Sequence, residues 1–272
     1  MNKKQKCKYV FVILTYRNTT DIRDCIQSIL NNVDDFKIIV VDSFYDKETK
    51  NEIEEIASQY NSIFITIPNK GYSFGNNRGI EYAMNSFDFD YVVVLNPDTI
   101  ITHFDDSKLD VYSNYVIGPR IVNLQNKHQN PLKFKRSKIL ETMIYKGLKF
   151  RNSFLLYLGF AINKIIRIAY LCVHLFRDNI QVYALHGSCV IFPKSVLAKI
   201  GLPYDENIFL FAEEDVLAQK CKKKGIESYV FDGISILHKE DGSMNFNSSS
   251  VNHSNLAKSY IYMFEKYVQG LD

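Results

Sequence analysis

The chain has 272 residues, of which 46% are hydrophobic and 23% are charged. This composition excludes an intrinsically disordered chain, and the length allows a single large core. The five cysteines form no CxxC pair and are odd in number. We therefore expect neither a disulfide framework nor a structural zinc site, and we expect a cytoplasmic location.

The net charge of +3 conceals a strongly basic segment. Residues 127–177 contain eleven Lys or Arg and one acid, Glu141, which gives +10 for this segment and −7 for the rest of the chain. The longest charge-free apolar stretch, 152–163, is shorter than the roughly 20 residues that a membrane-spanning helix needs. We therefore expect no transmembrane helix.

The first 120 residues alternate short β-branched runs with helical patterns. Strands are predicted at 9–14, 37–41, 63–67 and 91–95. Helices are predicted at 21–30 behind a Thr20 cap, at 47–59, and from about 75 to 84. This alternation is typical of a doubly wound, mostly parallel α/β sheet with helices on both faces, whose ligands bind at the carboxyl ends of the strands.

The second half of the chain has a more mixed pattern. The basic segment is predicted to be helical and amphipathic. After it we expect a strand at 182–192, a short helix between Pro193 and Gly201, and a helix at 213–224. Two short strands within 228–237 and a C-terminal helix complete the predicted elements.

Polar residues follow the first two predicted strands. Thr15, Tyr16 and Arg17 end the first strand, and Asp42 ends the second. A carboxylate at this place accepts hydrogen bonds from a ribose or base edge, and a tyrosine ring offers a flat surface to a base. The alternative is that Asp42 only caps a loop.

The segment NKGYSFGNNRGI, residues 69–80, has glycines at every fourth position, beginning with Gly71. Glycine lets the backbone approach a ligand closely, and the amides of Asn69 and Asn77 lie beside these glycines in the sequence. The spacing matches neither GxGxxG nor a Walker loop, so dinucleotide and P-loop sites are not favoured. The alternative is a tight helix entry packed on the sheet.

The segment LNPDT, residues 95–99, directly follows the predicted strand 91–95. This position places Asp98 at the rim of the sheet, where its oxygens could bind Mg²⁺ or Mn²⁺ against a diphosphate. The alternative is a simple Asn-Pro-Asp turn.

These motifs, in this order, resemble glycosyltransferase family 2, especially its rhamnosyltransferase-like members. The similarity covers 9–118 and 183–243, about two thirds of the chain, and is carried by VILTYRN, VVDSFYD, NKGYSFGNNRGI and LNPDT. It implies a GT-A fold in which Thr15, Tyr16, Asp42 and Asn77 line a nucleoside pocket. It also implies that Asp98 meets a divalent metal that bridges the diphosphate.

Two positions depart from the family pattern. Ser43 stands where Asn is usual, and Asn96 replaces the first Asp of many metal motifs. The loss of one charged ligand weakens the prediction of metal dependence more than that of sugar-nucleotide binding. The complete predicted substrate-binding set is Thr15, Tyr16, Arg17, Asp42, Asn69, Gly71, Asn77, Asn96 and Gly187.

The segment FLFAEEDVLAQKCKKKG, residues 209–225, resembles the acidic motif of the same family. Alignment from Gly225 places Glu214 as the general base that accepts the acceptor proton, with Asp215 as the competitor and Glu213 as its neighbour. The alternative is that the three acids only favour the helix dipole. His238, in the flanking ILHKEDGS motif, is predicted as a further metal ligand, or else it is an ordinary loop histidine.

The basic segment is the part least similar to the family. Residues 133–177 interleave cations with long aliphatic side chains, which fits the surface of an anionic membrane close to a lipid-linked acceptor. A helical hairpin buried in this protein or in a homodimer partner is the alternative. We expect no nucleic-acid partner, because no nucleic-acid motif is present.

The sequence thus predicts a single catalytic domain with three parts: a nucleotide-sugar half at 1–125, a basic insertion at 126–180 and an acceptor-side half at 181–272. The expected reaction is the inverting transfer of a sugar from a UDP- or dTDP-linked donor to a saccharide or lipid-linked acceptor, in bacterial surface polysaccharide synthesis. The alternatives are a sugar nucleotidyltransferase, whose glycine-rich signature is absent, and a non-catalytic relative that binds sugar nucleotides. The enzyme is expected on the cytoplasmic side, with a possible peripheral position at the membrane.

Overall fold

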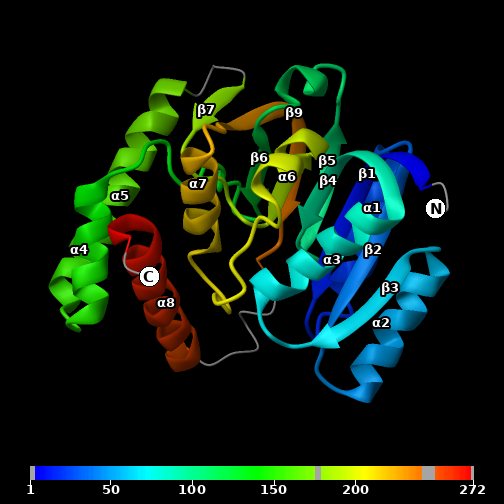
Figure 1. Ribbon diagram of the computed structural model, residues 1–272, viewed down its shortest axis with the longest axis horizontal. Coiled ribbons are helices and arrows are strands. Elements are labelled where there is room, and N and C mark those ends of the chain that lie inside the picture. The colour runs from blue at the N-terminus through cyan, green and yellow to red at the C-terminus, as the bar shows by residue number, and fades with distance from the viewer. Residues whose placement is uncertain (1–3, 175–178, 241–248, 271–272) are drawn as a thin grey trace.

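The computed structural model describes residues 4–174, 179–240 and 249–270 (Figure 1). Its centre is one nine-stranded sheet in the order β3-β2-β1-β4-β8-β6-β9-β5, with β7 paired to β9. The strands are β1 (Gln5–Thr15), β2 (Phe36–Phe44), β3 (Ile63–Pro68), β4 (Phe87–Leu95), β5 (Thr99–Phe104), β6 (Val116–Asn123), β7 (Ile180–Val182), β8 (Cys189–Pro193) and β9 (Ser228–His238). The helices are α1 (Asp21–Asn32), α2 (Lys47–Gln59), α3 (Tyr72–Ser86), α4 (Lys138–Lys149), α5 (Ser153–His174), α6 (Lys194–Ile200), α7 (Glu213–Lys223) and α8 (Ser249–Met263), with short helices at Leu109–Tyr112 and Phe264–Gln269.

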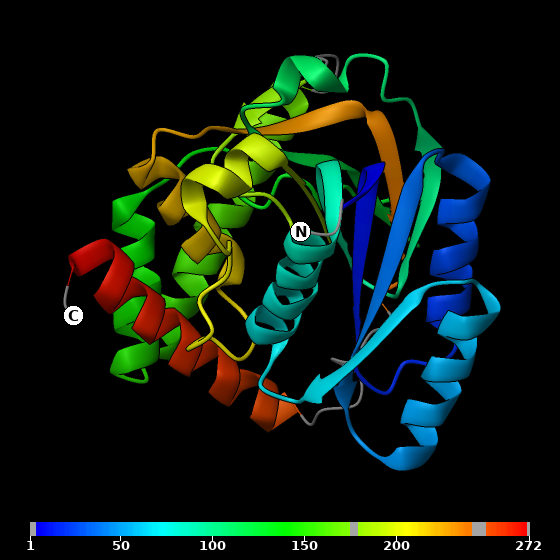
Figure 2. The same cartoon turned by 45° about the vertical axis from the view of Figure 1, so that its right-hand side comes forward.

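The half of the sheet formed by β3, β2, β1 and β4 is parallel and covered on both faces. Alternate residues of β1 enter different core clusters: Phe11 packs with α1 and α2, whereas Val12 packs with α3. Burial on both faces explains why these strands read as continuous apolar runs. The predicted α/β fold class and the first four strands are confirmed (Figure 2).

The other half of the sheet contains antiparallel pairs, because β8 runs against β4 and β6, and β5 runs against β9. Two predicted boundaries are wrong here. The strand expected at 182–192 is divided into β7 and β8 by a loop at 183–188. The two short strands expected within 228–237 are one strand, β9, which bends at a register shift opposite β6.

The cap predicted for α1 is also wrong. Thr20 has helical backbone angles and makes no capping hydrogen bond. The side chain of Asn18 instead accepts a hydrogen bond from the Asp21 N–H at 3.0 Å, while its amide donates to the Asp21 carboxylate at 2.8 Å. This turn fixes the start of α1 directly behind the end of β1.

The basic segment forms the hairpin of α4 and α5, which lies with α8 at the side of the molecule opposite α1 and α2 (Figure 1). Ile144 and Tyr145 of α4 pack against Met263 and Phe264 at the C-terminal end. The window Ser153–Tyr170 of α5 has a mean hydropathy of 1.3, and only 6% of it is buried. Contrary to the sequence-based expectation, this helix is long and apolar enough to cross a membrane by length and composition.

Candidate active site

Three polar side chains lie in one row at the carboxyl ends of β1, β2 and β3. Thr15 and Asp42 were predicted as substrate-binding residues, and Thr66 was not. Thr15 pairs with Asp42, and Asp42 pairs with Thr66. The Thr66 hydroxyl donates to the Asp42 carboxylate at 2.9 Å. Burial raises the pKa of Asp42, and this hydrogen bond opposes the rise. Asp42 is therefore a buried acceptor at the rim of the sheet, the place where α/β sheets bind their ligands.

An aromatic corner lies beside this row. The rings of Tyr16 and Tyr45 meet edge to face with their centroids 5.8 Å apart, and the Arg17 guanidinium lies 4.0 Å from the centre of the Tyr45 ring. Tyr45 is 45% exposed, so the corner presents an aromatic surface to solvent. Tyr16 and Arg17 were predicted as substrate-binding residues, and Tyr45 joins them only through the fold.

Gly71 lies where the start of α3 contacts the loop before α7. Its φ of 95° lies in the region that favours glycine, and an added Cβ would stand 2.2 Å from the carbonyl oxygen of Phe209. The Tyr72 N–H donates to the same carbonyl at 2.7 Å, and the Asn69 side chain accepts from the Gly71 N–H at 3.2 Å. Asn69 and Gly71 therefore shape the entry to α3 against the loop before α7.

Asn77 is buried inside this junction. Its amide group donates to the Tyr204 carbonyl at 3.0 Å, and its oxygen accepts from the Tyr204 N–H at 3.2 Å. A further contact of 3.1 Å joins the same amide to Glu206. These contacts engage both ends of the Asn77 side chain, and its predicted contact with a nucleoside stays a prediction.

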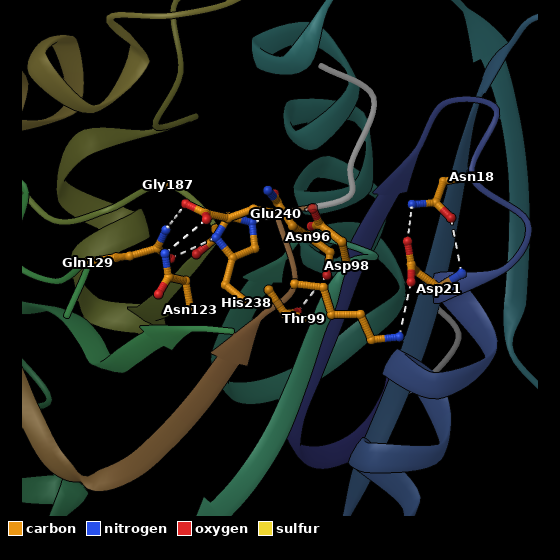
Figure 3. Close-up of polar contacts among 12 residues, drawn as sticks. Asn18, Asp21, Asn96, Asp98, Thr99, Asn123, Gln129, Gly187, His238 and Glu240 are labelled. Carbon is orange, nitrogen blue, oxygen red and sulfur yellow. Dashed lines mark hydrogen bonds and ion pairs between the residues drawn. The ribbon is translucent and has the colours of Figure 1, made fainter. Parts of the chain in front are cut away.

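Asp98 lies at the start of β5, opposite the end of β9, and is 3% exposed. Its Oδ2 is 3.4 Å from His238 Nε2. Its Oδ1 is buried and has no hydrogen-bond partner within the residues that the structure describes. In Figure 3 Asp98 lies between His238 on one side and Asp21 on the other.

The tautomer of His238 follows from its neighbours. Gln129 donates its amide to Glu240 at 2.6 Å, so its oxygen faces His238 Nδ1 at 2.7 Å and accepts from it. Asn123 donates to the other Glu240 oxygen at 2.9 Å (Figure 3). Nδ1 thus faces Gln129 and Nε2 faces Asp98, which is the arrangement of a histidine held for metal binding by an outer partner.

The pair of Asp98 and His238 therefore fits a divalent cation. An unpartnered carboxylate oxygen and an imidazole nitrogen are suitable ligands for Mn²⁺. No group of three His, Cys, Asp or Glu side chains arranged for a metal occurs among the described residues. Asp98 and His238 thus supply two candidate ligands at this place.

Two residues near Asp98 were missed by sequence reasoning. The ring of His186 lies 5.5 Å from that of His238, and burial lowers the pKa of His186 to about 3, which keeps it neutral. Lys239 binds Asp21 at 3.0 Å and Asp24 at 2.6 Å, and its N–H donates to the Asp98 carbonyl. His186 and Lys239 stand within the HGSCVIFP and ILHKEDGS motifs; the part of the latter from residue 241 onward lies outside the described residues.

The three acids of the AEEDV motif open α7 through a strained turn. Phe211 and Ala212 both have positive φ, 71° and 64°, which is uncommon for residues other than glycine. Strained backbone of this kind concentrates at functional sites, where it fixes the direction of nearby side chains.

The environments of Glu213, Glu214 and Asp215 differ. Asp215 is 6% exposed and forms an ion pair of 2.5 Å with Lys133. Glu213 is also buried, and burial together with the nearby charge of Glu214 raises its pKa well above the usual value. Glu214 is half-buried, and burial raises its pKa to about 6. Of the three acids, Glu214 is therefore the one that is partly exposed, and its pKa lies at about 6.

The loop at 183–188 contacts both Glu214 and the LNPDT turn, which contains Asp98. The Asn96 N–H donates to the Ser188 carbonyl at 2.9 Å, and the Tyr72 hydroxyl donates to the Gly187 carbonyl at 2.8 Å. The Gly187 N–H hydrogen-bonds Glu214, and a Cβ at Gly187 would stand 2.9 Å from Glu214 Oε1. Ser188 thus contacts Asn96 of the LNPDT turn, and its neighbour Gly187 contacts Glu214 of α7.

Comparison with known families gives a clear match. Residues 7–246 match the family described as glycosyltransferase like family 2. The chain belongs to this family. The match confirms the resemblance seen in the sequence motifs.

A curated relative supports the same grouping. The low-salt glycan biosynthesis hexosyltransferase Agl10 of Haloferax volcanii is 27% identical over 221 residues, which cover 79% of this chain. This chain spans 62% of the length of that relative.

Solved structures show the fold. The structure of GalNAc-T7 with UDP, GalNAc and Mn²⁺ matches 97% of this chain and 50% of its own, with a TM-score of 0.64 and 12% identity. S. aureus TarS 1–349 in complex with UDP-GlcNAc matches 89% of this chain and 61% of its own, with a TM-score of 0.51 and 13% identity. The sheet and helices described above are therefore those of GT-A glycosyltransferases.

Proposed function

We propose that this protein is an inverting glycosyltransferase that moves a sugar from a nucleoside diphosphate, UDP or dTDP, to an acceptor hydroxyl. The observation that carries the proposal is that the short loop at 183–188 contacts the LNPDT turn through Ser188, His238 through His186, and Glu214 through Gly187. Inverting transfer requires a site that binds the diphosphate on one side of the donor sugar and a general base on the other side. By the family likeness, the acceptor belongs to bacterial surface polysaccharide synthesis.

In this proposal the nucleoside lies at the carboxyl ends of β1 and β2, with Asp42 as an acceptor and the Tyr16–Tyr45 corner against the base. Asp98 Oδ1 and His238 Nε2 would hold a Mg²⁺ or Mn²⁺ ion, as UDP accompanies Mn²⁺ in the GalNAc-T7 structure. A bound cation supplies positive charge to the diphosphate as it leaves.

The acceptor is activated by Glu214. Its carboxylate takes the proton of the acceptor hydroxyl, whose oxygen forms a bond to the anomeric carbon. The bond from that carbon to the diphosphate oxygen breaks at the opposite face, so the configuration inverts. The Gly187 N–H hydrogen-bonds the Glu214 carboxylate and fixes its direction. The adjacent Asp215 does not act as the base, because it forms an ion pair with Lys133.

A donor screen tests this function. We expect UDP- or dTDP-linked sugars with Mn²⁺ to raise the melting temperature, because a ligand that binds the folded state stabilises it. Transfer or slow hydrolysis of the same donor should follow. Release of pyrophosphate from a sugar 1-phosphate and a nucleoside triphosphate would instead identify a nucleotidyltransferase, and binding without turnover on any acceptor would identify a non-catalytic relative.

We further propose that the hairpin of α4 and α5 rests on the anionic cytoplasmic face of a membrane. Its outer face carries apolar side chains that are strongly exposed: Ile139, Phe150, Phe154, Tyr157 and Ile165, each 65% exposed or more. The cations Lys138, Lys146, Arg151 and Lys164 are exposed on the same hairpin. Each cation near an anionic surface adds about 1 kcal/mol to binding.

Co-sedimentation with lipid vesicles tests this position. We expect binding to vesicles that contain phosphatidylglycerol, weaker binding to purely zwitterionic vesicles, and loss of binding in a Phe154→Ser, Ile165→Ser double variant. Val111→Ser, which changes an equally exposed apolar residue outside the hairpin, should bind as the wild type does. A concentration-dependent dimer that ignores lipid would show that a second copy of the chain covers this face.

A further inference from the structure

A cavity of about 280 Å³ lies where α4, α5 and α8 meet the loop before α4. This volume is close to the lower limit of pockets that hold small ligands, about 300 Å³. Lys133, Lys135 and Arg136 line one part of it, and Leu140, Ile144 and Ile166 line another. The cavity therefore offers cationic and apolar walls to one occupant.

The three cations of the cavity wall differ in their ion pairs. Lys133 pairs with Asp215 at 2.5 Å, and Arg136 pairs with Glu141 at 3.1 Å. Lys135 is exposed and takes part in none of the ion pairs found among the described residues, and its ammonium group lies 5.8 Å from the centre of the Tyr170 ring. Lys135 is thus the cation that remains for an anionic ligand.

Tyr260 supplies a second, independent indication of a ligand. The residue lines the same cavity and is 5% exposed. Its hydroxyl is buried and has no hydrogen-bond partner in the described part of the chain. A buried hydroxyl without a partner is costly, so a donor in this position is expected to meet an acceptor atom of a bound molecule.

The cavity adjoins the proposed acceptor side of the active site. Lys133 reaches from its wall to Asp215, the residue that follows Glu214. Ile166 and Tyr170 of its wall belong to α5, which also carries the exposed apolar side chains Phe154, Ile165 and Ile168. The cavity therefore lies between the acids of α7 and the apolar face of the hairpin.

We propose that this cavity binds the phosphate group of a lipid-linked acceptor. Lys135 and the Tyr260 hydroxyl contact the phosphate oxygens, and the first part of the lipid chain lies against Leu140, Ile144 and Ile166. The lipid then continues along α5, and the acceptor sugar extends past Lys133 toward Glu214. This inference rests on the proposed transfer reaction and names the chemical class of its acceptor.

Calorimetric titration with farnesyl phosphate, below its micelle concentration, tests the proposal. We expect Lys135→Ala to weaken binding about tenfold, because a charge-assisted hydrogen bond is lost, and Tyr260→Phe to weaken it about fivefold. Lys199→Ala and Tyr82→Phe remove an exposed cation and an exposed hydroxyl that lie outside both the cavity and the hairpin, and both should bind as the wild type does. Farnesol and inorganic phosphate should each bind at least about tenfold more weakly than farnesyl phosphate.

Three results would overturn the proposal. Equal affinity of Lys135→Ala and Lys199→Ala would show that the cavity does not hold the phosphate. Farnesol as tight as farnesyl phosphate would show apolar adsorption alone, and inorganic phosphate as tight would show a site for soluble phosphates. Binding of UDP with Mn²⁺, measured on the same samples, reports on the proposed function separately, so its absence would contradict that function and leave the cavity result readable.

Discussion

Replacement of Glu214 by Gln is expected to lower the rate of sugar transfer by about 10²–10⁴-fold, the usual contribution of a general base. The amide retains the shape of the side chain but accepts no proton. The affinity for UDP with Mn²⁺ should remain that of the wild type, because Asp98 and His238 are unchanged. Initial rates at saturating donor and acceptor, with UDP affinity measured by calorimetry, separate the two effects.

Glu213→Gln is the matched control for this variant. Burial and the charge of Glu214 raise the pKa of Glu213 well above its usual value, which favours its neutral carboxyl group. An amide of the same shape should therefore change the rate by less than about tenfold. A wild-type rate in Glu214→Gln, or equal losses in the two variants, would remove Glu214 from the role of base.

The pH dependence of the wild-type enzyme gives an independent check on Glu214. Burial raises its pKa from 4.5 to about 6, so protonation begins near pH 6. The base is active only when ionised; hence the rate should be constant above this pH and fall about tenfold per pH unit below it. A rate that stays flat from pH 7 down to 5 would mean that a carboxylate with an ordinary pKa acts as the base.

Asp98→Asn is expected to have the second large effect. It keeps the shape of the turn and removes the charged oxygen that would hold the cation. We expect Mn²⁺-dependent binding of UDP to weaken at least about 100-fold, since even outer partners of metal ligands contribute about 10–100-fold. Titration of UDP with and without Mn²⁺ measures the change.

The control for Asp98→Asn removes a charge from the same region. Asp24→Asn changes a largely exposed carboxylate that pairs with Lys239 at 2.6 Å. It should leave Mn²⁺-dependent UDP binding within about twofold of the wild type, since exposed ion pairs contribute little. Equal losses in the two variants would show that a general change of charge, and not metal binding by Asp98, is responsible.

The parallel half of the fold was predictable because its strands β2, β1 and β4 are buried on both faces. A continuous apolar run such as 91–95 is then visible without knowledge of its neighbours. The loop at 183–188 was not predictable, since Val182 and Cys189 continue one apolar pattern but pair with different strands, β9 and β4. The break between β7 and β8 is determined by strand pairing between residues that are far apart in the sequence.

The site shows the same division. Family motifs indicated Asp42, Asp98 and Glu214, whereas the distinction between Glu214 and Asp215 required Lys133, which lies 82 positions from Asp215 in the chain. The engagement of Asn77 with Tyr204 and the contact of His186 with His238 also join distant segments. Side-chain type at one position does not reveal such partners.

The account depends most on the cation site at Asp98 and His238, beside the loop that leads to Glu214. The most direct measurement is a crystal structure with UDP and Mn²⁺, in which anomalous scattering locates the metal. We predict a single Mn²⁺ peak bound by Asp98 and His238 and by the diphosphate, with the open end of the diphosphate facing Glu214. A metal or nucleotide bound elsewhere, with Asp98 unliganded, would contradict the account.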